Sequence, residues 1–138
     1  NWTGDAYWNV TLDDFVSITN HALDNGFTVG WDGDADDPDF HYNEGYASLK
    51  NPPLGDQQKA RQQAFDNQTT LLDHMMHIVG RAHQNGATWY YVKNSWGQTT
   101  NSTGGFLYMR EDYYKMRTVA MIVHKNAVPA PIRKKMGI

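Results

Sequence analysis

The chain has 138 residues, no cysteine and a formal net charge of −3. This length accommodates one domain, and the lack of cysteine excludes disulfides, thiolate metal sites and a cysteine nucleophile within these residues. Five Trp, eight Tyr and five Phe supply enough large apolar surface for a core, so the composition argues against disorder. No apolar run approaches the roughly 20 residues of a membrane span, so we expect no membrane partner.

The charge is unevenly distributed along the chain. The first 50 residues carry ten acidic residues and one lysine, whereas residues 110–138 carry seven basic and two acidic residues. A basic end can contact nucleic acid. These basic residues are few and mostly lack aromatic neighbours, so we expect no nucleic-acid partner. The first five residues contain neither a basic start nor an apolar stretch, so we expect no signal peptide and interpret the start as a cut end.

Apolar spacing predicts helices mainly in the first half of the chain. Thr11 is a suitable N-cap for a helix whose apolar side chains recur at helical spacing, and Gly26 is a natural stop. In chain order the first half is predicted to contain a helix over 11–25, a strand over 27–31, a solvated acidic loop over 32–39, an irregular aromatic segment over 40–49, a turn over 51–55 and a polar helix over 56–66.

The second half of the chain reads as a series of antiparallel strands. Asn85-Gly86 is a strong hairpin signal between two β-rich segments. The elements expected here are strands over 71–80, 88–92, 105–109 and 119–123, a loop over 98–104, a helical turn over 112–116 and an irregular tail opened by Pro129 and Pro131. Helices followed by antiparallel strands indicate an α+β fold.

A histidine and an asparagine flank the predicted hairpin. His74 enters the first strand and Asn94 leaves the second, and neighbouring strands lie about 4.8 Å apart. The Asn94 carboxamide oxygen can accept a hydrogen bond from one imidazole N–H, which leaves the other nitrogen for a reacting group. A neutral amide suits a thiol partner, because the thiol can transfer its proton to the imidazole as an ion pair. Trp96 is placed to cover this hydrogen bond.

Several segments resemble the C-terminal half of a papain-like cysteine peptidase. The matching stretches are Leu72-Asp73-His74, Val79-Gly80, Lys93-Asn94-Ser95-Trp96-Gly97 and Gly105-Phe106-Leu107. The insertion before the histidine, with residues 59–61, and the closing segment 123–129 are most similar to the bleomycin hydrolase or aminopeptidase C branch. The resemblance covers residues 8–129.

The resemblance implies an α+β fold and a role for each matched residue. Residues 1–129 would form the C-terminal, antiparallel β-barrel-like lobe with flanking helices, and 130–138 a C-terminal tail. His74 would be the general acid and base, and Asn94 its orienting partner. Trp96 would shield the pair, and Asp73 and Met75 would line the substrate cleft.

The family's nucleophilic cysteine and oxyanion-hole glutamine belong to an N-terminal half that these residues lack. The resemblance therefore implies the missing N-terminal lobe and a peptide substrate as partners, and no cofactor. In the bleomycin hydrolase branch a C-terminal arm enters the cleft, so Ile138 would supply a carboxylate to the substrate's free amine. Members often form hexamers, which implies a homo-oligomer. The family also implies a cytoplasmic location, with a secreted or periplasmic one left open.

Three explanations for the missing nucleophile remain open from the sequence. The chain is a fragment of an active cysteine peptidase, a non-catalytic binding or regulatory module with the same fold, or part of an enzyme whose nucleophile has been exchanged. An alkylating probe on the parent protein separates the enzyme from the binding module.

Two further patterns in the sequence are weak. Asp32, Asp34 and Asp36 match the first positions of a calcium loop, but Asp37 stands where glycine is needed and Asn43 where glutamate is needed, so we expect no metal. N-glycosylation sequons begin at Asn1, Asn9, Asn67 and Asn101.

Overall fold

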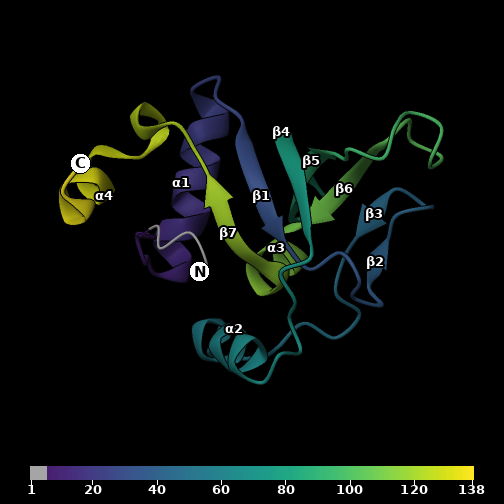
Figure 1. Ribbon diagram of the computed structural model, residues 1–138, viewed down its shortest axis with the longest axis horizontal. Coiled ribbons are helices and arrows are strands. Elements are labelled where there is room, and N and C mark those ends of the chain that lie inside the picture. The colour runs from purple at the N-terminus through teal and green to yellow at the C-terminus, as the bar shows by residue number, and fades with distance from the viewer. Residues whose placement is uncertain (1–5) are drawn as a thin grey trace.

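The computed structural model describes residues 6–138, so the sequon at Asn1 lies outside the described residues. One curled sheet forms the body of the lobe, with strand order β2-β3-β6-β5-β4-β1-β7 (Figure 1). The strands are β1 Val29–Gly33, β2 Phe40–His41, β3 Tyr46–Ala47, β4 His74–Gln84, β5 Ala87–Lys93, β6 Phe106–Arg110 and β7 Thr118–Ile122. All neighbours are antiparallel except β3 and β6.

Four α-helices and one short 3₁₀-helix accompany the sheet in the described part of the chain. They are α1 Leu12–Asp24, α2 Gln57–Asp66, α3 Glu111–Arg117, α4 Ala130–Met136 and the 3₁₀-helix η1 Lys125–Ala127. The predicted α+β class and the barrel-like antiparallel lobe are confirmed. Among residues 6–138, no helix combines the length and apolar character that crossing a bilayer requires.

The first predicted helix forms because its N-cap residue and its apolar face both favour a helix over the same residues. The Thr11 side chain accepts a hydrogen bond from the Asp14 N–H, and Leu12, Phe15 and Ile18 on the inner face of α1 are buried. Phe15 joins the main core, whose largest wholly buried side chains include Trp31, Tyr90, Tyr113 and Tyr114. The aromatic content therefore fills the inside of the curled sheet.

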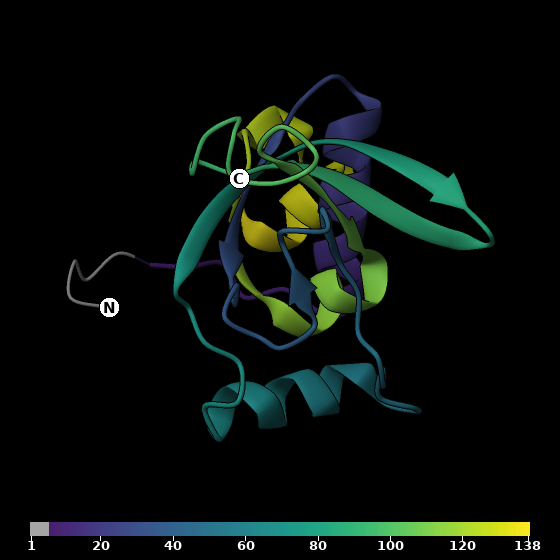
Figure 2. The same cartoon turned by 90° about the vertical axis from the view of Figure 1, so that its right-hand side faces the viewer.

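The polar helix α2 is predicted correctly and lies outside the core. None of its residues is buried, and Figure 2 shows it beneath the sheet, connected to β4 by a loop. Arg61 attaches it to the body: its guanidinium donates to the Thr118 carbonyl at 2.6 Å and lies 5.3 Å from the centroid of the Phe15 ring. Burial lowers the pKa of Arg61.

Several segments differ from the expected elements in their bounds or in their type of structure. The segment 40–49 contains the two short strands β2 and β3, which the sequence analysis treated as irregular. The strand expected over 71–80 begins instead at His74 and continues to Gln84. The tail expected to be irregular forms α4, because Pro131 is tolerated in the first turn and Gly137 ends the helix with φ 74°. Buried Ile132 anchors α4 to a cluster with Ile18 and Val128.

Candidate active site

Two neighbouring strands bring His74 and Asn94 together. The hairpin of β4 and β5 has Asn85 and Gly86 in its turn with positive φ, and the Cα register pairs His77 with Lys93. Asn94 follows Lys93 directly, so its side chain lies beside the start of β4. The hairpin turn and the register together place these two side chains as the sequence spacing predicts.

The hydrogen bond between the two residues fixes the state of the imidazole. Nε2 of His74 lies 2.7 Å from Oδ1 of Asn94. A carboxamide oxygen can only accept, so Nε2 carries the proton and donates it, and in the neutral ring Nδ1 keeps its lone pair. Within residues 6–138, Nδ1 of His74 has no hydrogen-bond partner. The base-bearing nitrogen is therefore left available to another group.

The Asn94 side chain is held in place from its own strand end. It is buried, and its Oδ1 also accepts from the Ser95 N–H at 2.7 Å. Its main-chain N–H donates to the Gly105 carbonyl at 2.9 Å. Gly105 has φ 85°, and a Cβ built there would lie 2.5 Å from the Gly97 carbonyl oxygen, so only glycine fits this contact. The backbone of Gly105 therefore packs tightly against Gly97, three residues after Asn94.

The Trp96 ring lies next to the imidazole of His74. Its ring centroid lies 4.8 Å from that of His74, and 49% of the residue remains exposed. The Tyr42 ring meets Trp96 edge-on at 4.7 Å, and the Tyr42 hydroxyl lies 2.6 Å from Oγ1 of Thr100. Tyr42 and Thr100 could not be identified as site residues from the sequence, because nothing in local spacing shows that segment 40–49 lies beside Trp96.

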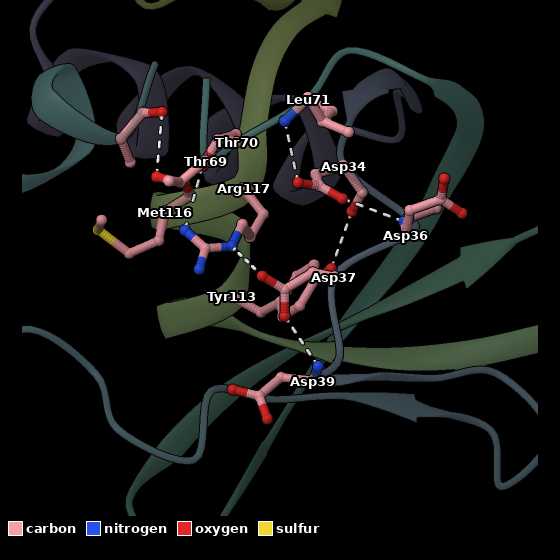
Figure 3. Close-up of polar contacts among 12 residues, drawn as sticks. Asp34, Asp36, Asp37, Asp39, Thr69, Thr70, Leu71, Tyr113, Met116 and Arg117 are labelled. Atoms are coloured by element: carbon pink, nitrogen blue, oxygen red, sulfur yellow. Dashed lines mark hydrogen bonds and ion pairs between the residues drawn. The ribbon is translucent and has the colours of Figure 1, made fainter. Parts of the chain in front are cut away.

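The acidic loop over 32–39 is hydrogen-bonded to the segment that precedes His74 and β4 (Figure 3). Asp34 is only 3% exposed, and its two carboxylate oxygens accept from the main-chain N–H groups of Asp36 at 3.0 Å and Leu71 at 2.9 Å. Burial raises the pKa of Asp34, whereas the Leu71 N–H lowers it. The prediction of a solvated acidic loop is therefore wrong at this position, because the loop binds the segment before β4.

An ion pair closes the same loop onto α3. Nε of Arg117 lies 2.6 Å from Oδ2 of Asp37, and the guanidinium also donates to Oγ1 of Thr70 at 3.1 Å (Figure 3). The Tyr113 hydroxyl donates to the Asp34 carbonyl at 2.8 Å. Burial, reinforced by Asp37 and Asp34, raises the pKa of Tyr113, so this hydroxyl stays protonated. The loop residues are thus engaged in structural contacts, and no group of three metal-binding side chains is found within residues 6–138.

Of the three residues expected to line the substrate cleft, Asp73 and Met75 adjoin His74 in the chain, whereas Ile138 follows α4. Asp73 precedes His74, and its Oδ1 accepts from the Ala35 N–H at 2.9 Å. Met75 follows His74 and is 50% exposed. Ile138 follows α4, whose buried face packs on α1, and Figure 1 shows this end of the chain across α1 and β7 from β4. The structure therefore places Asp73 and Met75 beside His74 and does not bring Ile138 to it within this chain.

The imidazole of His74, oriented by Asn94, can perform the proton transfers of an acid–base reaction. An imidazole with a fixed Nε2 proton and an unpaired Nδ1 can accept a proton from an acidic nucleophile and return it to a leaving group. The chain itself holds no cysteine. A histidine and an asparagine are two of the three members of the Cys-His-Asn arrangement found in papain-like proteases.

Comparisons with known proteins agree with this class. The family model described as the Peptidase C1-like family matches residues 4–137, and the chain therefore belongs to this family, which contains bleomycin hydrolase and aminopeptidase C. A comparison with curated proteins finds no significant match.

Two solved structures share the fold. PepW from Lactobacillus rhamnosis HN001 matches with a TM-score of 0.68 and 16% identity, over 94% of this chain and 30% of that one. Procathepsin L2 proteinase from the larval midgut of Tenebrio molitor matches with a TM-score of 0.51 and 23% identity, over 82% of this chain and 31% of that one. The chain thus spans about a third of the length of the structures it matches.

Proposed function

We propose that this chain is the His- and Asn-bearing C-terminal part of a cysteine peptidase, an aminopeptidase of the bleomycin hydrolase type. The observation that carries the proposal is the 2.7 Å contact between His74 Nε2 and Asn94 Oδ1, which leaves Nδ1 unpaired. The nucleophilic cysteine is supplied by a preceding part of the same protein. This chain alone is expected to be inactive, because it holds no cysteine.

The proposed reaction uses Nδ1 of His74 for every proton transfer. The cysteine thiol gives its proton to Nδ1, and the thiolate attacks the peptide carbonyl carbon. The imidazolium then protonates the departing amine while the C–N bond breaks, which leaves an acyl-enzyme thioester. Nδ1 next takes a proton from water, and the hydroxide adds to the thioester carbonyl carbon. The C–S bond then breaks to release the carboxylic acid, and the imidazolium returns its proton to the thiolate. Asn94 holds the ring in one orientation throughout, and Trp96 keeps water from its hydrogen bond.

Variants of the longer protein test the assignment of His74. His74→Ala is expected to lower kcat at least a hundredfold, because it removes the proton acceptor and donor. His77→Ala is a matched control: this exposed histidine lies three residues further along β4 and contacts Thr28 Oγ1 at 2.7 Å. Unchanged peptide hydrolysis in His74→Ala would remove the catalytic assignment.

A second variant and a chemical probe complete the test. Asn94→Ala is expected to lower turnover about a hundredfold with the fold retained, because the imidazole loses its fixed orientation. An alkylating probe should label one cysteine in the wild-type parent protein. If the parent is neither labelled nor active on peptides, the chain is better explained as a non-catalytic binding or regulatory module with the same fold.

A further inference from the structure

Tyr42 reaches the candidate active site from a distant part of the chain. It lies between β2 and β3, and β3 pairs with β6, the strand that follows the loop carrying Trp96. The Tyr42 ring meets the Trp96 ring edge-on with centroids 4.7 Å apart, and the Trp96 ring lies 4.8 Å from that of His74. Tyr42 is 8% exposed, whereas Trp96 is 49% exposed. A buried ring therefore packs against the half-exposed ring that contacts the histidine.

Two hydrogen bonds connect the Tyr42 hydroxyl to the main chain next to Trp96. The Tyr42 hydroxyl lies 2.6 Å from Oγ1 of Thr100, and Oγ1 of Thr100 lies 2.7 Å from the Gly97 carbonyl oxygen. A carbonyl oxygen can only accept, so Thr100 donates its single hydroxyl hydrogen to Gly97. The hydrogen between the two hydroxyls therefore belongs to Tyr42, which donates to Thr100. The donors run in one direction, from Tyr42 to the residue that follows Trp96.

Tyr42 is itself held by its neighbours. The Phe40 ring stacks on it, with centroids 6.3 Å apart and 3° between the ring planes. Nδ2 of Asn101 donates to the Tyr42 carbonyl at 3.1 Å and to the Phe106 carbonyl at 2.7 Å, and Oδ1 of Asn101 accepts from the Gly105 N–H at 2.7 Å. The Asn101 side chain therefore joins the segment that carries Tyr42 to the loop that carries Trp96 and to β6.

We propose that Tyr42 is a positioning residue, which holds the Trp96 ring against His74. It acts through its own ring and through the hydrogen bonds that run by way of Thr100 to Gly97. This inference rests on the proposed function of the site. A Trp96 ring kept in one place limits rotation of the imidazole and excludes water from one side of it, so the ring stays oriented for proton transfer.

Variants of the full-length protein test the part played by the two hydroxyls. Tyr42→Phe keeps the ring and removes the hydroxyl, and Thr100→Val does the same for the threonine. Each is expected to lower kcat about three- to tenfold, because the imidazole is less firmly oriented. The double variant should lose no more than the larger single loss, since both changes interrupt the same chain of hydrogen bonds. Thr100→Ser keeps a hydroxyl and should recover most of the loss seen in Thr100→Val.

A matched control changes a tyrosine of the same segment that lies away from Trp96. Tyr46 is exposed, and its ring contacts His41 with centroids 4.7 Å apart. Tyr46→Phe removes the same hydroxyl group as Tyr42→Phe and should leave kcat within about twofold of the wild type. Thermal unfolding of each variant confirms that it is folded at the temperature of the assay.

The position of the Trp96 ring is measured independently of turnover. Fluorine NMR of the full-length protein labelled with 5-fluorotryptophan gives a signal for Trp96, assigned as the one that is lost in Trp96→Phe. The shift of this signal between H₂O and D₂O increases with exposure of the ring to solvent. It should increase in Tyr42→Phe and in Thr100→Val, return towards the wild-type value in Thr100→Ser, and stay at that value in Tyr46→Phe.

Two outcomes would overturn this inference while leaving the peptidase proposal intact. One is a Tyr42→Phe variant in which either the Trp96 signal or kcat stays at the wild-type value. The other is a Thr100→Ser variant that is impaired as much as Thr100→Val. A parent protein with no peptidase activity and no labelled cysteine would contradict the proposed function itself, and the Trp96 signal would still show whether Tyr42 holds the ring. The two failures are therefore distinguishable.

Discussion

Replacing Asp34 by alanine should loosen the connection between the acidic loop and the start of β4. The carboxylate accepts from the Leu71 N–H at 2.9 Å and the Asp36 N–H at 3.0 Å, and the residue is almost fully buried. An unsatisfied part-buried N–H costs about 1–3 kcal/mol, and two are left behind here. Relief of the cost of burying the Asp34 charge offsets part of this loss, so we expect a net destabilisation of about 2 kcal/mol.

Chemical and thermal unfolding of the chain measure this effect. A loss of about 2 kcal/mol corresponds to a decrease in Tm of roughly 6–8 °C for a domain of this size. Hydrogen exchange should accelerate at the Leu71 amide, whose acceptor has been removed. Asp36→Ala is the matched control, since the exposed Asp36 side chain makes no hydrogen bond within residues 6–138 and its removal should cost less than about 0.5 kcal/mol.

A third variant separates charge from hydrogen bonding. Asp34→Asn keeps one acceptor oxygen but points an amide N–H₂ at the second main-chain donor, so it should be destabilised nearly as much as the alanine variant. If Asp34→Ala unfolds within about 0.5 kcal/mol of the wild type, or shows the same loss as Asp36→Ala, the acidic loop does not hold the approach to His74.

Three further predictions follow from other contacts. The pair Asp37–Arg117, at 2.6 Å and largely buried, should give a coupling free energy of about 1–2 kcal/mol in a double-alanine cycle, and independent additive effects would contradict it. Gly105→Ala should be more destabilising than Gly104→Ala by at least about 1 kcal/mol in urea unfolding. Both residues have positive φ, but only at Gly105 would the added Cβ lie 2.5 Å from a carbonyl oxygen. Burial raises the pKa of Asp32 above its ordinary 3.8 in the folded state, so the free energy of unfolding falls as pH rises through the window above 3.8. Asp32→Asn should flatten that part of the pH–stability profile, and an unchanged profile would contradict the raised pKa of Asp32.

The hairpin and the histidine–asparagine contact could be predicted from the sequence because both depend on local rules. Asn85-Gly86 adopts the positive φ values of a tight turn, and the turn sets the register that places Asn94 beside the start of β4. The first helix is equally local, since Thr11 caps it and its apolar residues recur at helical spacing.

The sequence interpretation was wrong where the conformation depends on distant partners. The acidic loop is compositionally typical of a solvated loop, yet Asp34 is buried because Leu71 and Tyr113 approach it from far along the chain. The tail contains two prolines and reads as irregular, but Ile132 gains burial against Ile18 and so stabilises α4. None of these distant partners can be identified from the spacing of residues, because no local periodicity connects the segments that they join.

The amino-acid sequence by itself determined the secondary structure of the central hairpin, the class of the fold and the pair His74 and Asn94. Only the tertiary structure decided that Tyr42 supports Trp96, that Asp34 holds the segment before His74, and that Ile138 lies on the far side of α1. The physical reason is that turn geometry and side-chain periodicity act over a few residues. Burial of an acid or an aromatic ring, in contrast, depends on which distant segments the folded sheet brings together.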